Sequence, residues 1–176
     1  MRIISGTHKG RHIRPPKNFR ARPTTDSAKE SLFNILENHY DLKKVRILDL
    51  FSGTGGIGFE FASRGCLMAH LIEKNKNHTR FIEKIIHDFN FEHVKVFHSD
   101  AYRSIRNTNE HYDLIFADPP YDQPGIEKIP DMIFEYNILN KNGRFIFEHS
   151  GKFDLSDHSH FIEQRQYGSV HFSFFE

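Results

Sequence analysis

Hydrophobic residues recur along this chain in blocks of two kinds. Compact apolar runs, such as residues 45–50 and 112–117, are typical of strands that are buried on both faces. Between the runs lie segments in which apolar side chains return every three or four positions, as in residues 75–89, and this spacing predicts helices. The alternation of the two patterns predicts a doubly wound α/β fold with a mostly parallel sheet.

The pattern assigns most of the chain to short elements. We expect strands at residues 45–50, 68–73, 94–98, 112–117 and 144–148, and helices at residues 57–63, 75–89, 101–106 and 126–136. Another helix should follow Ser27, because Ser27 and Glu30 have the spacing of a capping box. Residues 140–143 are predicted as a turn.

Hairpins are expected at the two ends of the chain. Residues 2–4 and 11–14 read as short strands of a small N-terminal hairpin. Residues 161–165 and 170–175 read as a final antiparallel hairpin around Tyr167-Gly168. In the last strand apolar and polar residues alternate, which is typical of a half-exposed strand.

The composition fits one soluble domain. The chain has 176 residues and a single cysteine, Cys66, which excludes an intramolecular disulfide framework and which we interpret as a small buried residue. No run of about 18 apolar residues predicts a membrane span. The thirteen histidines do not form a zinc-ligand pattern, so we expect no metal. We expect a cytoplasmic monomer that does not bind a membrane.

The formal net charge of +1 conceals a basic N-terminal arm, which we define as residues 1–25. Residues 1–22 contain seven basic residues and no acidic one, whereas the rest of the chain is mildly acidic. This distribution favours a polyanionic partner for the arm. We therefore divide the chain into a basic extension that would contact this partner, residues 1–25, and a main domain, residues 26–176.

A glycine-rich segment, residues 49–58, connects a predicted strand to a predicted helix. Gly53, Gly55 and Gly58 fit the pattern G-x-G-x-x-G, which permits a tight turn and close approach of a ligand to the backbone. Glu73 ends the next predicted strand, where a carboxylate can accept both hydroxyls of a ribose. This segment predicts a nucleoside-containing cofactor, either a nicotinamide dinucleotide or S-adenosylmethionine.

The turn Asp118-Pro119-Pro120-Tyr121 follows the strand at residues 112–117 and favours S-adenosylmethionine. The prolines fix the backbone and remove two N–H donors, which leaves the Asp118 carboxylate and the Pro119 carbonyl as acceptors. These acceptors can bind both N–H groups of an exocyclic amine, and the Tyr121 ring can stack on the base. The turn therefore predicts methyl transfer to a nucleobase amine.

With both motifs in place, the chain resembles the RsmD-type methyltransferases, which make N2-methylguanine in 16S ribosomal RNA. The resemblance covers nearly the whole chain. It rests on segments at residues 2–6, 9–11, 22–24, 29–36, 49–58, 63–65, 118–121 and 167–168. It implies a Rossmann-like class I methyltransferase fold, in which a seven-stranded, mostly parallel sheet ends in an antiparallel hairpin. Lys29 and Cys66 depart from the family's usual arginine and alanine, and the first departure could alter a phosphate contact.

The resemblance also implies the role of each site residue. The pocket for S-adenosylmethionine, whose product is S-adenosylhomocysteine, would be formed by Asp49, Phe51, Gly53, Gly55, Glu73, Asp100 and Ala101. The catalytic turn would be Asp118, Pro119, Pro120 and Tyr121. RNA would be bound by Arg2, Lys9, Arg11, Arg14, Lys17, Arg20, Arg22 and Thr24. The partner would be 16S rRNA, within the small ribosomal subunit or an assembly intermediate.

Three alternatives stay open at this point. An N6-adenine methyltransferase could use the same Asp-Pro-Pro-Tyr turn, although the chain has no room for a separate target-recognition domain. A nicotinamide-dependent oxidoreductase would leave that turn without a role. The third alternative is a non-catalytic RNA-binding assembly factor on the same scaffold. We also expect removal of residues 1–22 to weaken RNA binding and to spare cofactor binding.

Overall fold

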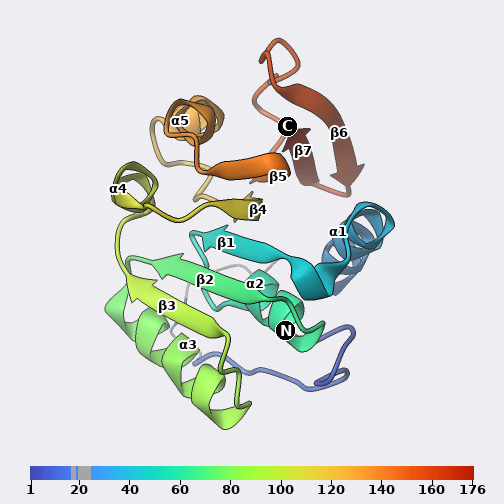
Figure 1. The fold of residues 1–176 in the computed structure, drawn as a ribbon, viewed down its shortest axis with the longest axis vertical. Helices are drawn as coiled ribbons and strands as arrows, with labels where there is room; N and C mark the ends of the chain where they lie inside the picture. Colours follow the sequence, from blue (N-terminus) through green and yellow to red (C-terminus); the bar gives the residue numbers. More distant parts are fainter. Residues whose placement is uncertain (17–18, 20–24) are drawn as a thin grey trace.

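The computed structural model describes residues 1–16, residue 19 and residues 25–176. Its centre is a seven-stranded sheet with the strand order β3-β2-β1-β4-β5-β7-β6 (Figure 1). The first five strands pair in parallel, and β7 pairs antiparallel with both β5 and β6. The strands are β1 (Arg46–Leu50), β2 (Met68–Glu73), β3 (Val94–His98), β4 (Tyr112–Ala117), β5 (Leu139–His149), β6 (Phe161–Tyr167) and β7 (Val170–Phe175). This arrangement confirms the Rossmann-like fold and the final hairpin.

Helices cover both faces of the sheet. One face packs against α1 (Asp26–His39), α2 (Gly56–Ser63) and α3 (Lys76–Asp88). The other face packs against α4 (Ala101–Asn107) and α5 (Ile129–Glu135), with the 3-10 turn η2 (Ile126–Lys128) beside α5. A second 3-10 turn, η1 (Leu42–Lys44), precedes β1. In Figure 1, α4 and α5 lie on one side of the sheet and α1 lies on the other.

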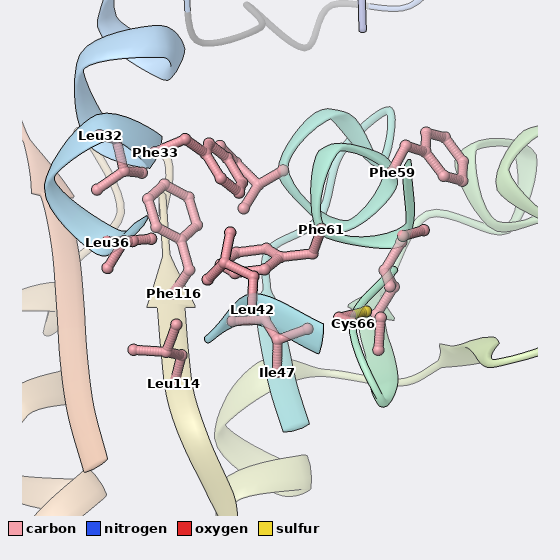
Figure 2. Close-up of a cluster of buried hydrophobic side chains, with 14 of the residues drawn as sticks. Leu32, Phe33, Leu36, Leu42, Ile47, Phe59, Phe61, Cys66, Leu114 and Phe116 are labelled. Carbon is pink, nitrogen blue, oxygen red and sulfur yellow. The ribbon is translucent and has the colours of Figure 1, made fainter. Parts of the chain in front are cut away.

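Aromatic and aliphatic side chains fill the space between the sheet and α1 and α2 (Figure 2). Phe33 of α1 packs on Phe61 of α2 with ring centroids 4.6 Å apart, and Phe116 of β4 projects toward them. Cys66 is buried in the same cluster, as the sequence predicted. Burial on both faces explains why apolar residues predominate in the central strands.

Helix α2 is buried on all sides because the N-terminal segment covers its outer face. Its residues from Ile57 to Ser63 are all buried, and Ile3 and Ile13 of the segment are buried in the same cluster. The predicted N-terminal hairpin forms as a short antiparallel pair, in which Arg2 lies opposite His12 and the Ile3 and Ile13 N–H groups donate to the Arg11 and Met1 carbonyls at 3.0 Å. The described part of this segment therefore packs into the main core.

Several element boundaries were wrong. The predicted capping box does not form, because α1 begins at Asp26 and Thr25 is its N-cap, whose hydroxyl accepts from the Ala28 N–H at 3.2 Å. The predicted turn at residues 140–143 lies inside β5, where the pairing with β4 shifts register. The predicted helix 126–136 divides into η2 and α5.

The last strand is more buried than its alternating sequence predicted. In β7 the residues from Phe172 to Phe175 are all buried, including Ser173. The reason is topological, because β7 lies between β5 and β6 and both of its faces are covered. Phe172 and Phe174 join the cluster under α1 and α2, whereas Phe175 joins the opposite one.

Candidate active site

A cavity of about 1160 Å³ opens at the carboxyl ends of the parallel strands. Ligands bind at this edge in open α/β sheets, where the strand order reverses between β1 and β4. Pockets for drug-sized ligands occupy roughly 300–1,000 Å³, so this cavity can hold a nucleoside cofactor together with part of a second molecule. Its lining joins the glycine-rich segment, the end of β2 and the Asp-Pro-Pro-Tyr turn.

Glu73, at the end of β2, connects two parts of the cavity wall. One carboxylate oxygen accepts from the Gly53 N–H at 2.8 Å, and the other accepts from the Asn75 N–H at 2.6 Å. Glu73 is buried and lines the cavity. Each carboxylate oxygen has a second lone pair, so a carboxylate held in this way fits the two hydroxyls of a ribose.

Asp49 stabilises the turn from the inside. It is buried, and its carboxylate accepts from the Gly58 N–H at 3.0 Å. The Ser52 hydroxyl donates to the Asp49 carbonyl at 2.6 Å. Burial, reinforced by the nearby charges of Glu73 and Glu148, raises the pKa of Asp49 to about 7. Asp49 also lines the cavity, so the structure brings it together with Glu73.

The three glycines of the predicted motif have different positions. Gly53 lines the cavity, with a φ of 55°. Gly55, at φ 80°, is the N-cap of α2 and lies outside the cavity lining. Gly58 packs against Leu71, since a Cβ there would lie 2.7 Å from the Leu71 side chain. Gly56, which the motif did not mark, lines the cavity instead.

The remaining predicted cofactor residues fall into two groups. Phe51 and Ala101 line the cavity. Asp100 is exposed and is the N-cap of α4, where its carboxylate accepts from the Arg103 N–H at 3.1 Å. It borders a smaller neighbouring depression with Lys74 and His98. Of the predicted acidic site residues, Asp49, Glu73 and Asp118 line the main cavity, whereas Asp100 lies outside that lining.

The four residues of the Asp-Pro-Pro-Tyr turn all line the cavity. Pro119 is buried, Asp118 is half-buried, and the Tyr121 side chain is exposed at the mouth. Burial raises the pKa of Asp118 well above its ordinary range, and the charges of Glu148 and Asp49 add to the effect. The turn therefore presents oxygen acceptors and an aromatic ring to one space.

Two lining features escaped the sequence analysis. Glu148, near the end of β5, is buried and lines the cavity, and its carboxylate lies 3.5 Å from the Tyr121 hydroxyl. Residues 166–170 of the β6–β7 turn form another part of the wall. Glu148 closes a predicted strand just as Glu73 does, so the same strand-end rule could have identified it.

The predicted RNA-binding residues are only partly described. Lys17, Arg20, Arg22 and Thr24 lie outside the described residues. Lys9 and Arg14 are exposed. Arg2 forms an ion pair with Asp26 at 3.5 Å, and the Arg11 guanidinium lies 5.4 Å above the Phe89 ring.

Lys29, expected near a phosphate, is buried instead. Its ammonium donates to the Arg2 carbonyl at 2.6 Å and pairs with Glu60 at 3.5 Å. It therefore ties α1 to the N-terminal segment and to α2, and burial lowers its pKa.

Metal ligands and membrane spans can be assessed for the described part of the chain. No group of three or more His, Cys, Asp or Glu side chains there could hold a metal ion. Within the same residues, no helix has both the length and the apolar character that crossing a membrane requires.

Comparison with known proteins gives consistent matches. The family described as Conserved hypothetical protein 95 matches residues 1–176. The Ribosomal RNA small subunit methyltransferase D of Buchnera aphidicola subsp. Baizongia pistaciae is 32% identical over 148 residues, which cover 84% of this chain and 75% of the relative. The protein of the same name from Escherichia coli K12 is 30% identical over 143 residues, covering 81% of this chain and 68% of the relative.

A solved structure supports the fold over the whole length. A hypothetical protein of Thermus thermophilus, TTHA0928, superimposes with a TM-score of 0.87 at 23% identity, covering 100% of this chain and 99% of that one.

Proposed function

This chain belongs to the family described as Conserved hypothetical protein 95, the RsmD-type methyltransferases, and we propose that it transfers a methyl group from S-adenosylmethionine to a guanine N2 amine in 16S rRNA. The coarser part of this proposal is methylation of small-subunit rRNA, which the names of its relatives support. The finer part, the N2 amine of one guanine, rests on the resemblance to the RsmD-type methyltransferases, and the chemistry of the cavity supports an exocyclic amine as the acceptor.

One observation carries the proposal: the Glu73-anchored turn and the Asp-Pro-Pro-Tyr turn open into a single cavity. The first offers a fixed carboxylate suited to ribose hydroxyls, next to the Gly53 backbone. The second offers acceptors for an amine. A cofactor site and an amine site that share one space are what direct methyl transfer between two bound molecules requires.

The residues of the chain contribute mainly by position and charge. Bound S-adenosylmethionine supplies an electrophilic methyl group. The Asp118 carboxylate and the Pro119 carbonyl accept the two N–H groups of the amine and orient its lone pair. They also stabilise the positive charge that develops on the nitrogen during attack. The Tyr121 ring stacks on the base and holds it in line.

The amine must first reach the cavity. A stacked guanine hides its N2 amine, so the target base is taken from an unpaired segment or is flipped out of its helix. The exposed basic residues Lys9 and Arg14 are suited to the phosphates around it.

The test is methylation with labelled S-adenosylmethionine of naked 16S rRNA and of small subunits that lack the modification. Digestion and mass spectrometry of the nucleosides then identify the product. We expect N2-methylguanosine at one site. N6-methyladenosine would overturn the base assignment, and tight cofactor binding without transfer to either substrate would argue for a binding factor.

A further inference from the structure

The sheet places Glu148 directly beside the Asp-Pro-Pro-Tyr turn. In the parallel pairing of β4 with β5, Ala117 is opposite Phe147, so Asp118 and Glu148 are the next residues of two adjacent strands. Both side chains line the cavity, and both lie at the same edge of the sheet.

Tyr121 connects Glu148 to the position of the base. The tyrosine hydroxyl lies 3.5 Å from one Glu148 carboxylate oxygen, although Tyr121 is at the mouth and Glu148 is buried. A base stacked on the Tyr121 ring, with its amine at Asp118, therefore has the Glu148 carboxylate near the same edge. The electrostatic influence of Glu148 on Asp118 is consistent with this proximity.

Purine bases differ in the protonation of N1, the ring nitrogen near the exocyclic amine. Guanine carries an N1–H donor next to its N2 amine. Adenine has an unprotonated N1, a lone pair, next to its N6 amine, and 2-aminopurine has the same lone pair next to an N2 amine. A carboxylate beside the amine acceptors attracts N1–H and repels the N1 lone pair, because an ionised carboxylate can only accept.

We propose that Glu148 accepts the N1–H of the target guanine and so selects guanine over purines that lack this N–H. The inference rests on the proposed function and assigns its base specificity to one residue. Asp118 and Pro119 then bind the two N2 hydrogens, and Glu148 binds the third N–H of the same edge.

The experiment compares guanine with 2-aminopurine at the methylated position. Once nucleoside analysis has located that position, a 16S rRNA with 2-aminopurine there is assembled by ligation of a synthetic segment. The amine is unchanged, whereas the N1–H and the O6 carbonyl of guanine are both lost, so variants of Glu148 are needed to assign a lower rate to the N1–H. For the unmodified protein we expect kcat/KM on 2-aminopurine to be lower by at least about tenfold, the effect of losing a hydrogen bond to a charged group.

Two variants show whether Glu148 is responsible. E148Q keeps the size of the side chain, and its amide can either accept from N1–H or donate to an N1 lone pair, so the preference should largely disappear. E83Q removes an exposed carboxylate of α3 that does not line the cavity, and it should keep the preference of the unmodified protein. Titration with S-adenosylhomocysteine confirms that each variant is folded.

The outcomes separate this inference from the proposed function. Methylation of adenine by the unmodified protein would defeat the proposed function. Methylation of guanine with equal use of 2-aminopurine would overturn the role of Glu148 alone, and this comparison needs no variant. An unchanged preference in folded E148Q would also overturn it.

Discussion

Asp118 is the residue on which we expect transfer to depend most. It is the carboxylate of the catalytic turn, and it faces the same cavity as Glu73. Replacement by alanine removes the acceptor that stabilises charge on the amine, so D118A should lower single-turnover transfer by roughly 10²–10³-fold, as loss of one preorganised hydrogen-bonding group does elsewhere. Affinity for S-adenosylhomocysteine should stay within a few-fold. E83Q, at an exposed carboxylate outside the cavity, is the control, and near-normal transfer by D118A would refute the role.

The raised pKa of Asp118 predicts a pH dependence. Transfer requires the ionised carboxylate, so activity should rise with pH as Asp118 loses its proton and should fall on acidification earlier than an ordinary aspartate would dictate. Because Glu148 contributes to the raised pKa, E148Q should move this acidic limb to lower pH. The measurement is single-turnover transfer between pH 5 and 9, and an unmoved limb in E148Q would argue against the coupling.

At the scale of elements, the N-terminal segment is fixed to α2 through a buried acid. The Glu60 carboxylate accepts from the Ile4 N–H at 2.8 Å and from the Ser5 N–H at 3.0 Å, and it pairs with Lys29 and Arg64. Such a buried group is well satisfied here, and removing it would leave the buried Lys29 ammonium without this ion pair, whereas Arg64 would keep its pair with Glu37.

Two glycines of this segment provide a matched pair of variants. Gly6 and Gly10 have nearly the same φ, 83° and 82°. A Cβ on Gly6 would lie 1.9 Å from the Ser63 carbonyl oxygen, whereas a Cβ on Gly10 would meet nothing within 4 Å. We expect G10A to lower the free energy of unfolding by about 1 kcal/mol, the cost of the left-handed backbone. G6A should cost at least about 2 kcal/mol, because the segment must also move away from α2.

Urea unfolding of both variants measures the difference. Equal losses would mean that the close approach of Gly6 to α2 contributes nothing to stability.

The sequence predicted the positions of the strands better than the burial of individual side chains. Strands such as Met68–Glu73 and Tyr112–Ala117 were predicted to the residue, because local apolar runs define them. The burial of Ser173 could not be predicted in this way, since it depends on β7 inserting between β5 and β6. Likewise Glu60 reads as a surface acid of a short helix until the N-terminal segment is seen to cover it.

The candidate site shows the same division. Asp118 and Glu73 were identified because each follows or ends a clear strand. Gly55 fits a motif pattern, yet its φ of 80° forms the turn before α2, and only the three-dimensional structure separates that use from lining a cavity. Glu148 was missed although it ends a predicted strand, and its place beside Asp118 becomes visible only in the pairing of β5 with β4.

At the scale of the whole molecule, Asp49 links the site to stability. Its pKa is about 7 in the folded chain, against 3.8 for an unperturbed aspartate. Between these values the folded state retains a proton that the unfolded state releases, so this group lowers stability as pH rises from about 4 to 7. His149 acts in the opposite direction, because burial lowers its pKa to about 4 and the unfolded state binds the extra proton below pH 6.5.

The variant D49N isolates the first effect. The asparagine side chain can still accept from the Gly58 N–H but does not ionise, so the stability of D49N relative to the unmodified protein should increase from pH 4 to pH 7. Each unit of pKa difference corresponds to about 1.4 kcal/mol. Denaturant unfolding across this range is the measurement, and a pH-independent difference between the two proteins would contradict the assignment.

At the scale of the whole molecule, the role of the basic arm in rRNA binding is better tested by reversing the charge of exposed residues than by deleting the arm. The sequence predicted that removal of residues 1–22 would spare cofactor binding. The structure changes this expectation, because the truncation would also remove the N–H partners of Glu60 and the Met1 side chain, which lines the cavity, so we expect it to impair cofactor binding as well. The double variant K9E/R14E changes two exposed side chains and leaves these interactions in place. We expect weaker rRNA binding with unchanged affinity for S-adenosylhomocysteine. The slope of log K against log salt should become shallower by roughly 0.7–0.9 for each phosphate that the variant no longer neutralises.

K128E, on η2 at the other face of the sheet, is the control and should keep the original slope. If K9E/R14E kept that slope as well, Lys9 and Arg14 would have no part in holding RNA, and binding would rest on other residues of the molecule.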